Sequence, residues 1–130
     1  MVVTEDRLAQ IARNDSQRAW RRRIALAWVG SISALIILQP VPTNPDAAEP
    51  AWANVLGIVF LAALGAMALG LRRQQRWAYA VSGGAGLLGM FLAYACLASG
   101  HHLGAWWMIE LGVFAGLTVM SITAAERTKP

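Results

Sequence analysis

The chain has 130 residues, of which 57% are apolar and only 14% charged, and its formal net charge is +4. Soluble domains average about 45 to 50% apolar and about 25% charged residues, so this composition excludes an ordinary water-soluble domain. The single cysteine excludes an intrachain disulfide and a multi-cysteine zinc site. Such a composition is typical of proteins that reside in the lipid bilayer.

Residues 1–23 form a basic segment that we expect to be helical and cytoplasmic. Thr4 is a suitable N-terminal cap, Glu5 and Asp6 follow it, and arginines accumulate toward the end of the segment. Leu8 and Ile11 begin a narrow apolar stripe. The stripe allows an interfacial helix or a docking surface for a cytoplasmic partner, and the alternative is a solvated leader into the first span.

Four apolar segments follow, and we predict that each forms a transmembrane helix. A spanning helix needs about 20 residues to cross a hydrocarbon core of roughly 30 Å. Three segments reach that length, whereas the first has 15 apolar residues before Pro40 and spans if Trp20 and the adjacent arginines extend to the interface. The predicted all-α membrane domain covers residues 24–125, followed by a tail at 126–130, with helices at 24–39, 52–71, 77–98 and 103–125.

A cleaved signal peptide is the alternative for the first apolar segment. Basic residues precede the segment, and Ala51, Trp52 and Ala53 resemble a small-residue cleavage site. The basic region would be unusually long for a signal peptide, and the cleavage site would lie far beyond the apolar run. We therefore expect the segment to be retained as a helix.

The basic residues predict the orientation in the membrane. All 11 fall before the first span, between the second and third, or after the fourth. Because Lys and Arg remain on the cytoplasmic side of short loops, we predict an inner-membrane protein with both termini and the middle loop in the cytoplasm. The residues expected at the inner membrane surface are Arg21, Arg22, Arg23, Arg72, Arg73 and Arg76. No recognised nucleic-acid motif accompanies these arginines, so we expect lipid headgroups rather than nucleic acid beside them.

Small residues at four-residue spacing predict where the helices approach one another, because association in lipid depends on close backbone contact. The segment at 77–98 carries two such rows, which predicts that it lies at the centre of the bundle. The segment at 103–125 carries a GxxxG sequence. The rows contain Ala62, Ala66 and Gly70; Ala78, Ser82 and Gly86; Ala85, Gly89 and Ala93; and Gly112 and Gly116.

Glu110 is the only ionisable carboxylate within an apolar segment, and such residues are expensive in a membrane and are often functional. A tight hairpin about residue 101 pairs residues that are equally far from the turn, which puts Glu110 at the depth of Ala93 and Tyr94. Tyr94 is the expected hydrogen-bond partner, and Ser31, Ser33 and Asn54 lie at similar depth. The sequence thus predicts one polar cluster, whose role is either transport or purely structural.

Metal and catalytic chemistry are poorly supported. His101, His102 and Cys96 are weak candidate ligands, since adjacent histidines in a turn point in different directions and no third ligand has the required spacing. No nucleophile with a neighbouring base and no phosphate-binding loop is present. We therefore expect no cofactor, no metal and no enzymatic activity.

Two functions from different classes fit this chain. The first is an accessory or structural subunit of a larger inner-membrane complex, favoured by short loops and several small-residue faces. The second is a homo-oligomeric transporter or channel that uses Glu110, because four helices enclose little room for a pathway in one protomer. The expected partners are the bilayer and either other membrane subunits or further copies of this chain.

Overall fold

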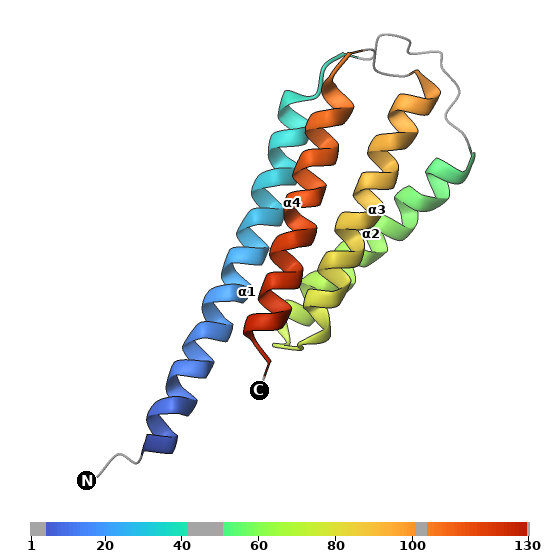
Figure 1. Ribbon diagram of the computed structural model, residues 1–130. Helices are drawn as coiled ribbons and strands as arrows, with labels where there is room; N and C mark the ends of the chain where they lie inside the picture. The colour runs from blue at the N-terminus through green and yellow to red at the C-terminus, as the bar shows by residue number, and fades with distance from the viewer. Residues whose placement is uncertain (1–4, 42–50, 101–103, 130) are drawn as a thin grey trace.

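The computed structural model describes residues 5–41, 51–100 and 104–129, and within these ranges the regular structure is entirely helical. The chain forms α1 (Glu5–Leu38), α2 (Ala51–Arg72), α3 (Trp77–Ser99) and α4 (Trp106–Arg127). The helices run alternately up and down beside one another, so the C-terminus lies at the same end as the α2–α3 turn (Figure 1). Most of the predicted outer loop lies outside the described residues. His101 and His102 of the predicted turn between the last two segments also lie outside them.

Three helices, α2, α3 and α4, are long and apolar enough to cross a membrane. Many of their large apolar side chains are exposed on the outside of the bundle, where lipid is the natural solvent, among them Ile58, Leu61, Phe91 and Val119. These helices indicate a small membrane protein. The first predicted span is not clearly one, because the apolar part of α1 is short and follows three consecutive arginines.

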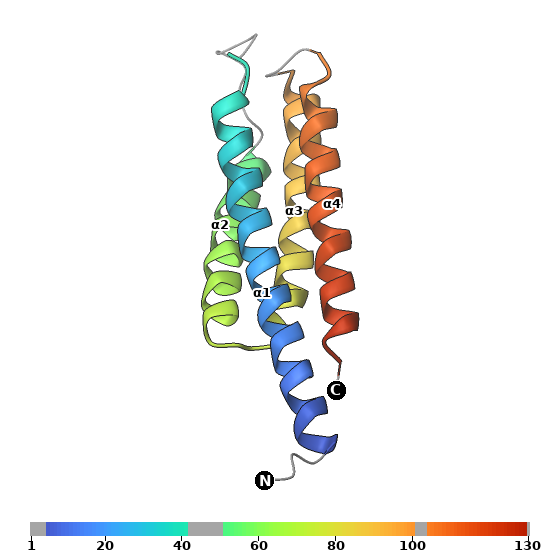
Figure 2. The same cartoon turned by 90° about the vertical axis from the view of Figure 1, so that its left-hand side faces the viewer.

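Helix α1 continues without a break through the predicted boundary between the basic segment and the first apolar segment. Its first half extends beyond the end of the other three helices (Figures 1 and 2). Leu8 and Ile11 of the apolar stripe are exposed there. The fully buried residues of α1 are Ile24 and Trp28. Partly buried residues from Trp20 to Leu35 pack against the core beside them, so the helix contacts the bundle over its second half.

The α2–α3 turn is closed by two backbone hydrogen bonds that depart from the helical i→i−4 pattern. The N–H of Gln75 donates to the carbonyl of Gly70 at 2.8 Å, and that of Gln74 donates to the carbonyl of Leu71 at 3.2 Å. This is the Schellman pattern that ends many helices, and Gln74 takes the left-handed position at φ 59° that glycine usually fills. A Cβ on Gly70 would lie 2.9 Å from Ala78 Cβ, so its lack of a side chain lets α2 and α3 approach closely at this end.

Helix α3 lies between α2 and α4, as its two rows of small residues predict, and all six residues of those rows are buried. A Cβ on Gly86 would come within 3.1 Å of the Phe114 carbonyl oxygen, and one on Gly89 within 2.4 Å of the Phe114 ring. Gly89 and Phe114 lie equally far from the turn after α3. The register expected from a tight hairpin therefore holds along α3 and α4.

The other two predicted small-residue rows lie mostly outside the packed interior of the chain. Of the three residues in the α2 row, Gly70 is buried against α3, whereas Ala62 is exposed and Ala66 half-buried. On α4, Gly112 and Gly116 are exposed, and a Cβ added to either would meet nothing within 4 Å. The GxxxG sequence faces outward because the opposite side of α4, which carries Phe114, faces α3.

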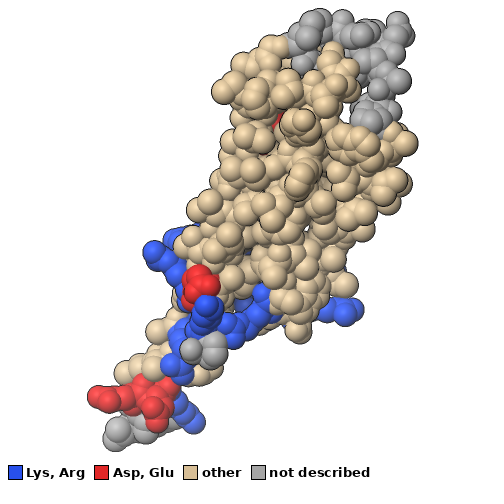
Figure 3. All heavy atoms as spheres, turned by 45° about the vertical axis from the view of Figure 1, so that its right-hand side comes forward, with Lys and Arg blue, Asp and Glu red and all other residues tan. Residues whose placement is uncertain are grey.

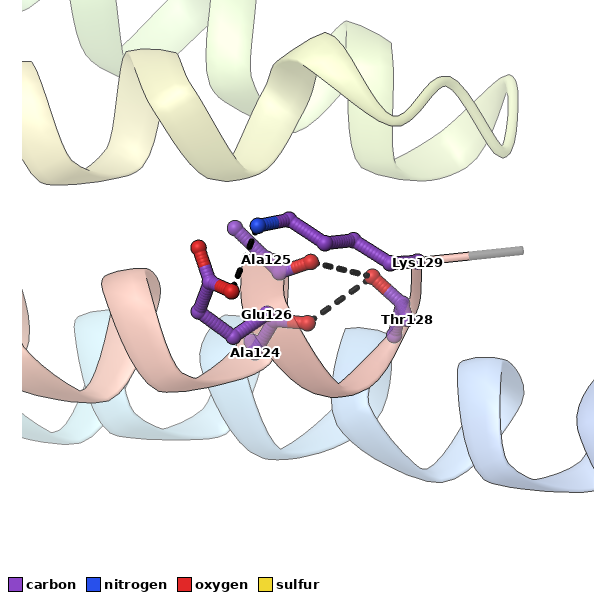
Figure 4. A network of polar contacts seen from close by, with 5 residues as sticks. All are labelled: Ala124, Ala125, Glu126, Thr128 and Lys129. Atoms are coloured by element: carbon purple, nitrogen blue, oxygen red, sulfur yellow. Dashed lines mark hydrogen bonds and ion pairs between the residues drawn. The ribbon is translucent and has the colours of Figure 1, made fainter.

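The last turn of α4 is closed by side chains (Figure 4). The Thr128 hydroxyl donates to the carbonyl oxygens of Ala124 at 2.8 Å and Ala125 at 3.4 Å. Lys129 forms an exposed ion pair with Glu126. The Thr128 backbone N–H also donates to the Ala124 carbonyl, at 3.1 Å, so the hydroxyl adds to the backbone bond that ends α4 and gives the Ala125 carbonyl a donor.

Candidate functional site

A series of buried hydrogen bonds crosses the bundle in the half nearer the α2–α3 turn. The indole N–H of Trp28 on α1 donates to Ser82 Oγ on α3 at 2.7 Å, and Ser82 Oγ lies 2.7 Å from Ser121 Oγ on α4. Ser121 also donates to the carbonyl of Leu117 at 2.6 Å. Both serines are fully buried, so these hydrogen bonds join α1, α3 and α4 through groups that have no access to water.

Three aromatic rings pack on this polar chain and close the core above it. Trp28 contacts Phe60 of α2 and Phe114 of α4, with ring centroids 6.1 and 6.3 Å apart. Phe60 and Phe114 meet edge to face at 5.7 Å. Because each ring comes from a different helix, the rings hold α1, α2 and α4 at one level of the bundle.

Glu110 lies one turn before Phe114 on α4, toward the opposite end from the basic residues. The indole N–H of Trp106 donates to Glu110 Oε1 at 2.8 Å, and both residues are partly buried. An N–H donated to a carboxylate oxygen stabilises the carboxylate and fixes its direction. The side chain is thus anchored on its own helix.

Glu110 lines a hollow of about 320 Å³ to which all four helices contribute. We call this the Glu110 hollow. Its polar groups are the Glu110 carboxylate and the Cys96 thiol, and the rest of its wall is aliphatic or aromatic. The lining residues are Ile32, Leu35, Ile36, Phe60, Leu61, Leu64, Leu92, Ala93, Cys96, Glu110 and Phe114.

A second hollow, of about 360 Å³, adjoins the first between α2 and α3. The two share Leu61, Leu92 and Cys96, and we call this second space the lateral hollow. Helices α2 and α3 meet at their turn and diverge toward the other end, where this hollow lies (Figure 1). Its remaining lining residues are Ala53, Asn54, Gly57, Ile58, Ala95 and Ser99.

The residues predicted to form one polar cluster are spread over the bundle instead. Asn54 lines the lateral hollow, Ser33 lines a hollow between α1 and α2, and Ser31 is half-buried on α1. Tyr94 is 57% exposed and lines a different hollow with Leu111. The depth prediction holds for Ala93, which lines the Glu110 hollow, whereas Tyr94 lies about 100° further around the helix and faces away.

One of the three weak metal candidates lies within the described residues. His101 and His102 lie outside the described residues, and Cys96 lines the two hollows. In the part of the chain that the structure describes, no three residues of His, Cys, Asp or Glu come together.

The basic residues gather at one end of the bundle, around the α2–α3 turn, the end of α4 and the adjoining part of α1 (Figure 3). Trp20 of α1 lies between two of them, with the guanidinium carbons of Arg23 and Arg127 at 5.2 and 5.8 Å from its ring centroid. Arg127 belongs to α4, so this contact ties α1 to α4 at the charged end. Arg72, Arg73 and Arg76 in the turn are exposed, as is Arg22, and Arg21 is half-buried.

Comparison with protein-family models, curated proteins and solved structures finds no match for this chain.

Sequence reasoning did not identify Trp28 or Ser121 as parts of a site. A usable signal existed, because Ser82 and Ser121 are equally far from the turn after α3, and polar residues at matching depth in adjacent spans are natural hydrogen-bond partners. No comparable signal marked Trp28, since an indole four residues beyond Ile24 is typical of an ordinary apolar segment. The pairing requires knowledge of which face of α1 meets the bundle.

Proposed function

We propose that the chain is a four-span inner-membrane protein without enzymatic activity that serves as an accessory subunit of a larger membrane complex. The observation that carries the proposal is the outward-facing GxxxG of α4. Gly112 and Gly116 leave a shallow, open strip along α4, flanked by exposed Met108 and Val119. In lipid, such a strip favours close approach by a helix from another chain.

The rest of the surface supports the same proposal. The described loops are short, and the parts outside the bundle amount to the protruding half of α1 and the charged end. A protein of this form offers helix faces rather than soluble domains for recognition. The exposed apolar stripe at Leu8 and Ile11 gives a partner a second point of contact outside the bilayer.

Gly112→Leu is expected to release the partner while leaving the bundle intact. The added side chain projects into open space within this chain but occupies the strip that a partner helix needs. The measurement is the mass of the complex purified from native membranes in mild detergent. Gly30→Leu on α1, which also projects into open space, is the matched control and should leave the mass unchanged. Retention of the same foreign subunits by Gly112→Leu would exclude this strip as the docking face.

The orientation is expected to place both termini and the α2–α3 turn in the cytoplasm, because the basic end of the bundle is retained there. In a Cys96→Ala background, an impermeant thiol reagent added to intact cells should label Asp46→Cys and leave Gln74→Cys unlabelled. Lysed cells, in which both positions are accessible, provide the control. The reverse labelling pattern would invert the orientation.

A homo-oligomeric transporter or channel is the second candidate function. It is favoured by one observation, that the intramembrane carboxylate of Glu110 lines a hollow built by all four helices. The same mass measurement distinguishes the two candidates. Foreign subunits support the accessory role, and a closed assembly of identical chains supports transport.

A further inference from the structure

We propose that one anionic phospholipid binds at the charged end of the bundle, with its phosphate in a polar hollow between α1 and the α2–α3 turn and its acyl chains in an apolar groove between α1 and α2. A general attraction of basic residues to lipid headgroups needs no particular site, whereas this inference assigns one lipid to one set of side chains. It goes beyond the accessory role, because the isolated chain can bind the lipid without a partner subunit.

The polar hollow has a volume of about 460 Å³, and we call it the Arg21 hollow. It lies where α1 passes the α2–α3 turn, in the region where the basic residues gather (Figure 3). Two arginines line it, together with one carboxylate among the described residues. The lining residues are Asn14, Asp15, Gln17, Arg18, Arg21 and Gln74.

The arginines at this hollow keep their charge for a ligand. Among the described residues, neither Arg18 nor Arg21 forms an ion pair, although Asp15 lines the same hollow. Arg76 in the adjoining turn also forms none within that part of the chain. A guanidinium group presents a planar set of N–H donors that fits the oxygens of a phosphate. The hollow is therefore suited to a phosphate group.

The Tyr79 hydroxyl adds a donor beside these arginines. Tyr79 is only 4% exposed, and within the described chain its hydroxyl forms no hydrogen bond. Buried tyrosine hydroxyls usually have a hydrogen-bond partner. The positive charges of Arg21 and Arg76 act on this hydroxyl, and Arg21 also lines the hollow. A phosphate held by these arginines supplies an acceptor for Tyr79.

The apolar groove lies on the same face of α1, further into the bundle, and we call it the α1–α2 groove. Trp28 lines it and comes seven residues after Arg21, which is almost two turns and about 10 Å along the helix. Because α1 packs on α4 more extensively than on α2, a space of about 320 Å³ stays open between α1 and α2. The lining residues are Trp28, Val29, Ile32, Ser33, Leu64, Met67 and Ala68.

The succession of the two spaces selects a phospholipid. A free phosphate ion uses the Arg21 hollow alone, and a neutral lipid uses the α1–α2 groove alone. In an anionic phospholipid, the phosphate and the acyl chains are joined in the order in which the hollow and the groove follow one another along α1. Basic pockets between helices on the cytoplasmic side of a membrane are suited to such headgroups.

The experiment counts the lipids bound to the purified full chain by native mass spectrometry in a mild neutral detergent. Dioleoyl phosphatidylglycerol is the probe, and dioleoyl phosphatidylcholine is the matched lipid with the same chains and no net charge. Glycerol phosphate represents a free phosphate. We expect one tightly bound phosphatidylglycerol, phosphatidylcholine binding that is weaker by about tenfold, and no saturable binding of glycerol phosphate.

Two substitutions test the polar half of the site. Arg21→Gln should weaken phosphatidylglycerol binding about fivefold, the usual effect of losing one arginine beside an anionic lipid. Its matched control is Arg73→Gln, which should have little effect because Arg73 is exposed in the turn and does not line the hollow. Tyr79→Phe removes only a hydroxyl and should weaken binding severalfold without unfolding the bundle. Tyr94→Phe, at an exposed position that lines a different hollow, is its control.

One substitution tests the apolar half. Ala68→Phe places a ring in the α1–α2 groove and should weaken phosphatidylglycerol binding severalfold. Ala62→Phe is the matched control, because Ala62 is exposed on the same helix and does not line the groove. If Arg21→Gln or Tyr79→Phe does not fold, the comparison of Ala68→Phe with Ala62→Phe and of the two lipids decides the question.

Several outcomes would overturn the proposal. Equal binding of the two lipids, or equal losses in Arg21→Gln and Arg73→Gln, would leave only a general attraction to headgroups. Parental affinity in Tyr79→Phe or in Ala68→Phe would reject the site as described. Saturable binding of glycerol phosphate that Ala68→Phe leaves unchanged would assign the hollow to a free phosphate. The mass of the native complex tests the accessory role separately, so the failure of one proposal is distinguishable from the failure of the other.

Discussion

Gly89→Leu is expected to separate α3 from α4 and to destabilise the bundle by about 3 kcal/mol or more, at the upper end of the usual cost of overpacking a core. Already the first added carbon would lie 2.4 Å from Cδ1 of Phe114. Phe114 cannot turn away without leaving Trp28 and Phe60, because its ring contacts both. The collision therefore disrupts the aromatic core as well as the helix pair.

The measurement is resistance to unfolding in mixed micelles as a denaturing detergent is added, followed by Trp fluorescence. Gly84→Leu is the matched control, since Gly84 is exposed on the same helix and a Cβ there would meet nothing within 4 Å. The control should unfold as the parent does. Equal stability of the two variants would show that α3 does not contact α4 at Gly89.

Ser82→Ala is expected to loosen α1 from the bundle and to cost about 1–3 kcal/mol, the usual penalty when a buried polar group loses its partner. The indole N–H of Trp28 then has no acceptor from Ser82, and Trp28 is only 3% exposed. Ser121 retains its bond to the Leu117 carbonyl, so α4 is less affected than α1. The same unfolding titration gives the free-energy change.

A double-mutant cycle isolates this bond from the loss of packing. Trp28→Phe removes the donor, and the combined variant should cost less than the sum of the two single changes, because the hydrogen bond can be lost only once. Ser33→Ala, at an exposed position on α1, is the control and should have little effect. Strictly additive changes would show that the Trp28–Ser82 bond contributes nothing to stability.

The helices and the register of α3 against α4 were predictable because both depend on local properties. Apolar length marks the spans, and a short turn leaves little choice in pairing residues that are equally far from it. The small-residue rows of α3 also identified its central place. Gly86 and Gly89 belong to these rows, and both lie where α3 closely approaches α4.

The polar cluster was not predictable from depth alone, since depth says nothing about direction around a helix. Ala93 and Tyr94 share a depth, but only one of two consecutive residues can face the core. The row that contains Gly89 and Ala93 could have shown that Tyr94 faces away. The positions of Asn54 and Ser33 depend on how far α2 diverges from α3 and on the angle between α1 and the other helices. Both are set by contacts between distant parts of the chain.

The GxxxG of α4 shows a further limit of such reasoning. The sequence identifies a surface suited to close approach but not the helix that approaches it. Inside this chain the large side of α4, with Phe114 and Leu117, packs on the small side of α3, so the glycines of α4 remain outside. Large residues on one helix matched with small residues on its neighbour pack as well as two small faces do.

Helix α1 is continuous from its protruding end to the hollow beside Glu110. Leu8, at the protruding end, and Trp28, in the core, are 20 residues apart, or about 30 Å at the rise of an α-helix. The fully buried residues of the helix are Ile24 and Trp28. The part of the helix that follows them supplies Ile32, Leu35 and Ile36 to the wall of the Glu110 hollow. Because the helix is continuous, one unbroken run of α-helical backbone joins the protruding end, where a partner could bind, to the wall of that hollow.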